Sequence, residues 1–89
     1  MYYVYVLQSL KDNEFYTGFT DNLERRIKEH NNKEEPSTKL RAPFRLIYYE
    51  GCFSKKDAIA REKYLKTGMG KKYIKNRVKN YLEFCNGER

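Results

Sequence analysis

The segment from Tyr2 to Ser9 constrains the fold more than any other part of the chain, because it is apolar at odd and even positions alike. Its β-branched and aromatic residues favour a strand, and a strand that is apolar on both faces is typical of a sheet covered on both sides. We therefore predict that this segment is the central strand of a small sheet, with other elements packed above and below it.

Two further segments complete the predicted sheet. Polar residues at 11–14 supply turn chemistry, and the aromatic and β-branched run from Phe15 to Thr20 then predicts an antiparallel hairpin with the first strand. Gly18 interrupts this second strand, and a glycine inside a strand often marks a bulge or a place where a ligand or another backbone comes close. A third strand is expected over 44–50, ended by Gly51.

The hairpin is followed by a helix and a loop. Polar residues at 20–22 can cap a helix that we expect to end at Asn31 or Asn32, with an apolar stripe that includes His30. From Lys33 to Pro43 the chain has both of its prolines, few apolar residues and several charges. We predict a surface loop there, mobile enough to close over a bound molecule.

Two helices are predicted after the third strand. Ser54 and Asp57 resemble a capping box, with Asp in place of Glu, at the start of a helix that ends at Lys66. The segment 67–70 contains two glycines and stops that helix. The last helix is expected over 71–84, where apolar residues fall on one stripe: Ile74, Val78, Tyr81, Leu82 and Cys85.

The order strand, strand, helix, strand, helix, helix predicts an α+β fold in which a small three-stranded antiparallel sheet is covered by three helices. A chain of 89 residues can build one core, which hides about 60% of the surface that the unfolded chain exposes. We therefore predict one domain over residues 1–89.

The charge of the chain points to a polyanionic partner. There are 19 Lys and Arg residues against 12 Asp and Glu, which gives a net charge of +7. An excess of this size attracts polyanions through counterion release and electrostatic steering. The alternative is that the lysines only keep a small protein soluble.

The cysteines and the hydropathy exclude several classes of protein. Cys52 and Cys85 are far apart and lie in no CxxC pair, so neither a zinc site nor a disulfide framework is indicated. Reduced thiols are the default in the cytoplasm, where we place the protein. No segment has the apolar length needed to cross a bilayer, and the short run at 2–7 lacks the features of a signal peptide.

Tyr5 and Tyr16 fall in the two strands of the predicted hairpin. If the register brings their hydroxyls to one face, they can orient a water or share its proton. A tyrosine with an ordinary pKa near 10 needs a neighbouring cation or metal to act as a base at neutral pH. The alternative is that both rings only pack, as strand tyrosines commonly do.

Arg26 and His30 are neighbours at i and i+4 on the first helix, so both can reach one phosphate. The arginine fork can bind phosphate oxygens at two points and stabilise charge that builds up in a transition state. Arg26 is otherwise an ordinary solvated arginine, as the adjacent Arg25 illustrates. His30, the single histidine of the chain, is otherwise a hydrogen-bonded residue of the core.

Glu62 is a carboxylate on an apolar helix face, between Ala58 and Leu65. That position directs it towards the sheet. A single carboxylate suits Mg²⁺, which completes its octahedron with waters and substrate oxygens. The alternative is an ordinary ion pair with Arg61 or Lys66.

These residues together resemble the GIY-YIG nuclease superfamily, in particular its short single-domain members and the N-terminal domain of excision-repair endonucleases. The resemblance covers nearly the whole chain. It is carried by the order and spacing of Tyr3-Val4-Tyr5, Tyr16-Thr17-Gly18, Arg26, His30 and the helix with Ala60-Arg61-Glu62. The first motif has Tyr3 where the family name has glycine, and the second has Thr17 where it has isoleucine.

The resemblance implies a GIY-YIG-type endonuclease that hydrolyses phosphodiester bonds with one Mg²⁺ or Mn²⁺ ion per site. By position, Tyr5 would help to deprotonate the attacking water, with Tyr16 assisting, and which of the two is the base is left open. Gly18 would allow close backbone approach. Arg26 would bind the scissile phosphate. His30 would support proton transfer, and Glu62 would hold the metal ion.

Some assignments stay open at this point. Asn76 is an approximate match to an asparagine that assists in some relatives. DNA is favoured over RNA as substrate, with structure selectivity and a role in DNA repair as expectations. A nucleic-acid-binding module with little cleavage and a protein-interaction scaffold are the alternatives. A homodimer through the sheet edge, or a partner protein that supplies specificity, is also open.

Overall fold

The computed structural model describes residues 1–87, and within them one antiparallel sheet organises the molecule. Its strands are β1 (Tyr2–Ser9), β2 (Phe15–Thr20) and β3 (Phe44–Cys52), in the order β2-β1-β3. The all-round apolar segment is therefore the central strand, as predicted. Because β1 is paired on both sides, β2 and β3 are the two edges of the sheet.

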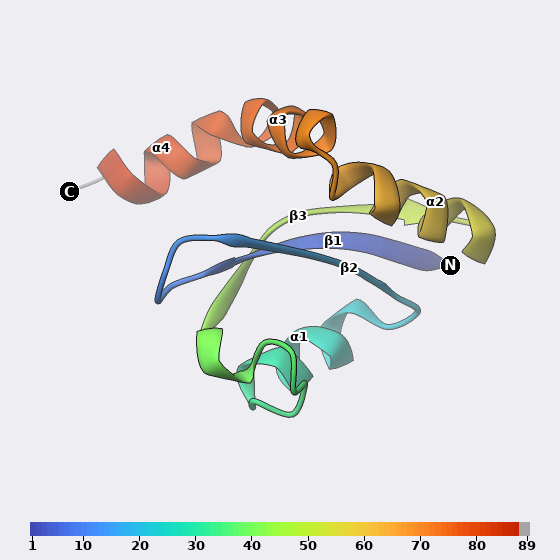
Figure 1. The fold of residues 1–89 in the computed structure, drawn as a ribbon, viewed down its shortest axis with the longest axis horizontal. Coiled ribbons are helices and arrows are strands. Elements are labelled where there is room, and N and C mark those ends of the chain that lie inside the picture. The colour runs from blue at the N-terminus through green and yellow to red at the C-terminus, as the bar shows by residue number, and fades with distance from the viewer. Residues whose placement is uncertain (88–89) are drawn as a thin grey trace.

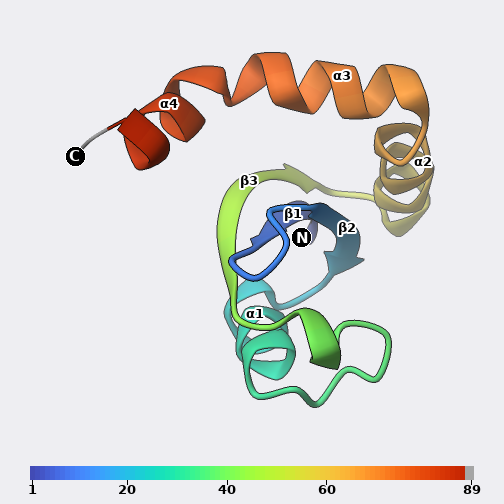
Figure 2. The ribbon, with the colours of Figure 1, turned by 60° about the vertical axis from the view of Figure 1, so that its left-hand side comes forward.

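The helices lie on both faces of this sheet (Figure 1). α1 (Leu23–Asn31) covers one face, and α2 (Lys55–Leu65) and α3 (Gly68–Arg77) lie on the other, with α4 (Lys79–Gly87) leading away from the end of α3 (Figures 1 and 2). Asn22 caps α1, since its side chain accepts a hydrogen bond from the Arg25 backbone N–H. The α+β class and the three-stranded antiparallel sheet are thus confirmed.

Alternate side chains of β1 build two separate cores. Val4 and Val6 point to the side of α2 and α3, where they pack with buried residues of those helices. Tyr5 and Leu7 point to the side of α1, where they pack with Ala42 and Phe44. All four β1 side chains are 1% exposed or less. This alternation decides which residues can meet on the α1 face, and it places a tyrosine hydroxyl inside the second core.

The last predicted helix is wrong in its extent and continuity. α3 begins at Gly68, three residues before the expected start, because Thr67 accepts a hydrogen bond from the Gly70 N–H and caps it. The helix then breaks at Val78, whose backbone leaves helical geometry (φ −108°, ψ 14°) while its side chain stays buried. The expected stripe is interrupted as a result, and Tyr81 is 43% exposed.

Two other boundaries differ from the sequence prediction. Gly51 does not end the third strand, since it pairs with Tyr3 and β3 continues to Cys52. Ser54 stands at the N-cap of α2 but its side chain makes no capping hydrogen bond, so the expected capping box is not formed, and α2 ends at Leu65.

The connection at 33–43 is more than a surface loop. It contains a short 3-10 helix, Lys39–Arg41, and two of its residues are buried, Thr38 and Ala42. Ser9 donates a hydrogen bond from its hydroxyl to the Arg41 carbonyl at 2.6 Å, which ties the connection to the end of β1. The segment therefore contributes side chains to the α1 face of the sheet.

Gly70 is a point where the fold tolerates no side chain. A Cβ at this position would fall against the backbone of Tyr64 and Leu65, whereas a Cβ on Gly68 would meet nothing within 4 Å. We predict that Gly70→Ala lowers the free energy of unfolding by about 1–3 kcal/mol, the usual cost of overpacking. Gly68→Ala is the matched control and should be neutral or stabilising. Urea denaturation measures both, and equal stabilities would contradict this account of the α2–α3 turn.

Candidate active site

The hairpin register brings the two candidate tyrosines to the same face. Tyr5 pairs with Gly18, and Tyr16 lies two residues from Gly18 on β2. The rings of Tyr5 and Tyr16 are 6.4 Å apart between centroids. A Cβ at position 18 would lie 2.6 Å from the Tyr5 Oη and 3.3 Å from the Tyr16 ring. Gly18 therefore makes room for the Tyr5 phenol, and close approach of a ligand or backbone at this position stays a prediction.

A chain of buried hydrogen bonds starts at Tyr5. Its hydroxyl is 3.0 Å from the His30 Nε2, and the His30 Nδ1 is 2.7 Å from the Thr38 Oγ1. Tyr5, His30 and Thr38 are each 1% exposed or less. Rings of Tyr5, Tyr16 and Phe44 surround the imidazole, with centroids 5.0 to 5.9 Å away. His30 is thus a fully hydrogen-bonded core residue and at the same time the neighbour of both candidate tyrosines.

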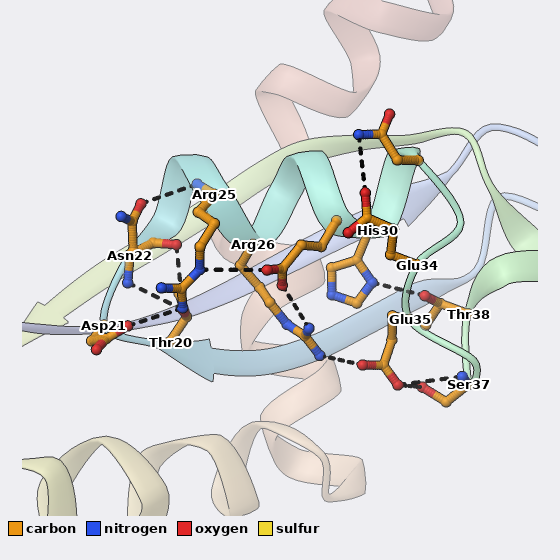
Figure 3. A network of polar contacts seen from close by, with 12 residues as sticks. Thr20, Asp21, Asn22, Arg25, Arg26, His30, Glu34, Glu35, Ser37 and Thr38 are labelled. Carbon is orange, nitrogen blue, oxygen red and sulfur yellow. Dashed lines mark hydrogen bonds and ion pairs between the residues drawn. The ribbon is translucent and has the colours of Figure 1, made fainter.

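Arg26 is held by two carboxylates (Figure 3). Its Nη1 donates to Glu29 at 2.9 Å and its Nη2 donates to Glu35 at 2.6 Å. Arg26 and His30 extend from the same side of α1, and Glu35 and Thr38 approach them from the 33–43 segment (Figure 3). Burial lowers the pKa of Arg26, but the hydrogen bonds to Glu29 and Glu35 outweigh it and raise the pKa. The hydrogen bond from Arg26 lowers the pKa of Glu35 to about 2.

The Tyr5 phenol is kept protonated by its surroundings. Burial raises its pKa to about 12, although Arg26 acts in the opposite direction. Charge on Tyr16 and Glu62 adds to the increase. At neutral pH Tyr5 is therefore a neutral hydroxyl, and it can act as a base only after passing its own proton to a neighbour such as His30.

His30 is neutral in this site. Burial lowers the pKa of the imidazole, and the positive charge of Arg26 lowers it further. A neutral imidazole has one N–H and one acceptor nitrogen, and both are used here. In either tautomer, one of the pair Tyr5 and Thr38 donates to the ring and the other accepts from it. The hydrogen bond between Thr38 and Nδ1 holds the ring with its Nε2 towards Tyr5.

Glu62 reaches this site from the opposite layer. It belongs to α2, which covers the other face of the sheet and packs against β1 and β2. Its side chain is 17% exposed, and its Oε2 lies 3.1 Å from the Lys66 Nζ. Because its charge raises the pKa of Tyr5, Glu62 lies within electrostatic range of the tyrosines. Arg61, the other expected ion-pair partner, binds Glu50 instead, at 2.8 Å.

The donor set at Glu62 fits a hard cation that keeps most of its own water. Among residues 1–87, no group of three or more His, Cys, Asp and Glu residues is arranged to hold a metal ion. Mg²⁺ does not require such a cage, since one or two carboxylates together with waters and substrate phosphate oxygens suffice. A half-buried carboxylate beside a basic, phenolic surface is consistent with that mode of binding.

Sequence reasoning missed three residues of this site: Glu29, Glu35 and Thr38. The ion pair of Glu29 with Arg26 could have been predicted, because Glu29 lies at i+3 from Arg26 on the same helix. Glu35 and Thr38 lie in a segment without regular periodicity, and no local signal shows that it folds back on α1. Asn76 is exposed on α3 and stays a prediction.

The fold and the site together define a class of protein. A family model described as the GIY-YIG catalytic domain matches residues 1–76, which includes every candidate site residue named above. The chain belongs to the GIY-YIG catalytic domain family. Membership places it in a nuclease family, and it confirms the resemblance found in the sequence.

Individual relatives agree with this assignment. The chain is 48% identical to the UPF0213 protein CPE1444 of Clostridium perfringens over 67 residues, which are 74% of this chain and 71% of the relative. It is 39% identical to the UPF0213 protein YazA of Bacillus subtilis over 66 residues, 73% of this chain and 66% of that protein. The solution NMR structure of the UPF0213 protein BH0048 from Bacillus halodurans matches with a TM-score of 0.51 at 37% identity, covering 83% of this chain and 82% of that one.

Within the part of the chain that the structure describes, no helix is both long and apolar enough to cross a membrane. Homodimer formation and a specificity-conferring protein partner stay predictions.

The buried imidazole predicts a pH-dependent stability. The folded state depresses the pKa of His30, so below about pH 6.5 the unfolded chain binds more protons than the folded one. We expect the free energy of unfolding to decrease as the pH falls from 7.5 to 5, and the decrease to be smaller in His30→Gln. The carboxylate of Glu35 contributes in a separate window, between about pH 4.5 and 2. Urea denaturation at each pH measures the effect, and identical slopes for both proteins would contradict it.

Proposed function

We propose that the protein is a metal-dependent endonuclease that hydrolyses phosphodiester bonds of nucleic acid, with DNA favoured over RNA. The observation that carries the proposal is the meeting of Tyr5, Tyr16, Arg26 and His30 on one face of the sheet, with Glu62 in electrostatic range. These residues come from four separate elements. Packing alone does not require an arginine, a histidine and two phenols to converge.

Proton transfer in this proposal runs from water through a phenol to the imidazole. The His30 Nε2 stands 3.0 Å from the Tyr5 hydroxyl and can take its proton when the ring is neutral. Tyr5 would then be able to accept a proton from the attacking water. Tyr16 is less buried than Tyr5 and packs beside the same imidazole, at 5.0 Å between ring centroids. It is the phenol better placed to orient that water.

Arg26 would bind the scissile phosphate. Its side chain is 26% exposed, and its guanidinium is already hydrogen bonded to Glu29 and Glu35. A phosphate that replaces one of these carboxylates would accept the hydrogen bond that it frees, and one that replaces both would accept a hydrogen bond from each of Nη1 and Nη2. Glu35 belongs to the 33–43 segment and Glu29 to α1, so exchange at Glu35 requires only a shift of the connection.

Glu62 would hold a divalent ion, Mg²⁺ or Mn²⁺. When bound, such an ion supplies an activated water or neutralises charge on the departing oxygen. In the absence of the ion, the carboxylate is partly buried and pairs with the Lys66 ammonium at 3.1 Å. Binding of the ion would replace this ion pair.

Replacing Glu62 tests the metal assignment. We expect Glu62→Gln to abolish Mg²⁺-dependent nicking of plasmid and branched DNA, since the amide keeps the shape of the side chain but not its charge. Binding of the same DNA in chelator should be retained, because the basic surface is unchanged. Nicking by the variant at the wild-type rate would remove Glu62 from the mechanism. Binding without cleavage by the wild type would instead support a binding module.

Arg26 and Arg25 form a matched pair on α1. Arg25 is 55% exposed and pairs with Asp21 and Glu29 at the surface. We predict that Arg26→Ala reduces kcat about 100-fold or more, the cost of removing a donor that stabilises transition-state charge. Arg25→Ala should have an effect of a few fold. Single-turnover cleavage, with circular dichroism to verify folding, measures both, and equal losses would contradict the assignment of helix faces.

A further inference from the structure

The outer edge of β2 is hollowed beside the candidate site. β2 is an edge strand of the sheet. One cavity of about 280 Å³ lies between β2 and the α2–α3 layer and is lined in part by Phe15, Tyr16 and Thr17. A second hollow, of about 140 Å³, continues at Asn13, Glu14 and Phe15. Both are lined by Phe15 and Lys71, so they adjoin each other along the β1–β2 turn and the first half of β2, and we call the two together the β2-edge groove.

Lysines line this groove from the helical side. Lys66 and Lys71 line the larger hollow, and Lys71 and Lys75 line the smaller one. Glu14 is the single carboxylate among the lining residues of the two hollows. Lys71 and Lys75 are i and i+4 on α3, so their ammonium groups follow one another along the groove. The groove therefore has a net positive charge that faces a strand edge.

The larger hollow borders the proposed catalytic site across the edge strand β2, since the hollow lies on the Val6 side of the sheet and the Tyr16 ring packs on the Tyr5 side. Tyr16 lines the larger hollow, and its ring also contacts the His30 ring at 5.0 Å between centroids. Lys66 lines the same hollow and pairs with Glu62 at 3.1 Å. A phosphodiester chain that has one phosphate at Arg26 and Glu62 would thus meet the lysines with its neighbouring phosphates.

We propose that this β2-edge groove binds a single strand of DNA, with Lys71 and Lys75 on phosphates next to the scissile one. The inference rests on the proposed function, because it places the strand relative to that site. Positive charge complements the phosphates, and the exposed part of Phe15 offers an apolar surface to a base.

The dimensions of the groove favour one strand over a duplex. Hollows of about 280 and 140 Å³ seat part of one strand and do not admit the width of a double helix. Val6, Leu65 and Ile74 are among the lining residues of the larger hollow and give it apolar surface. The choice of DNA follows from the proposed function, which favours DNA over RNA.

The test measures binding without catalysis. A fluorescein-labelled 12-nucleotide oligodeoxythymidine is titrated with protein in EDTA, from 50 to 200 mM salt, and followed by anisotropy. The variant Lys71→Gln/Lys75→Gln removes two groove lysines. The control, Lys63→Gln/Lys72→Gln, removes the same number of exposed lysines, one from α2 and one from α3, and neither of them lines either hollow. Circular dichroism verifies folding.

We expect the groove variant to bind at least about tenfold more weakly at 50 mM salt, and its slope of log K against log salt to be smaller by about 1.4, or roughly 0.7 for each lost phosphate contact. The control should bind within about twofold of wild type. Equal losses in both variants would overturn the proposal, as would tighter wild-type binding to a 12-base-pair duplex or to oligouridine than to the oligodeoxythymidine.

Cleavage assays separate this inference from the proposed function. If the wild type nicks DNA but the groove variant binds DNA as well as its control does, the nuclease assignment is supported and the proposed DNA-binding groove is wrong. If the groove variant loses binding as expected but the wild type cleaves no DNA, the proposed DNA-binding groove is supported and the nuclease assignment is wrong.

Discussion

The hydrogen-bond chain from Tyr5 through His30 to Thr38 is the interaction on which the α1 side of the molecule depends. Three polar side chains are almost fully buried there, and each would cost a few kcal/mol if it lost its partner. The chain joins the central strand, α1 and the 33–43 segment. A core built in this way stabilises the fold only when all three elements are in place. The same hydrogen bonds therefore fix both the geometry of the candidate site and the packing on the α1 side of the sheet.

The charged side chains at the boundary of that core are also paired with groups of opposite charge. The guanidinium of Arg26 is shared between Glu29 and Glu35, so this partly buried cation is paired with two carboxylates. Glu62 is similarly paired with Lys66 in the other layer. Close partners of opposite charge therefore neutralise both Arg26 and Glu62, and a polyanion that binds there would compete with the carboxylates for the same cations.

Elements whose pattern is local were predictable from the sequence. The strands at Tyr2 and Phe15 follow from their β-branched and aromatic residues. The helix over 23–31 follows from its apolar stripe and the cap at Asn22, which act within a few residues. The shared face of Tyr5 and Tyr16 required only the hairpin register. The position of Thr38 could not be predicted, because an irregular segment acquires its place from tertiary contacts alone. The helix break at Val78, between α3 and α4, could not be predicted either, because no glycine or proline marks it in the sequence.

Gly18 links two positions that are far apart in the sequence. Its lack of a side chain is what leaves the Tyr5 hydroxyl its place, since the nearest atom to an added methyl would be that oxygen, at 2.6 Å. A larger residue at 18 is compatible with the fold only if residue 5 becomes smaller. Among homologous chains, positions 5 and 18 should consequently vary together. A homologue in which both residues have changed would lack the Tyr5 hydroxyl but would keep the sheet.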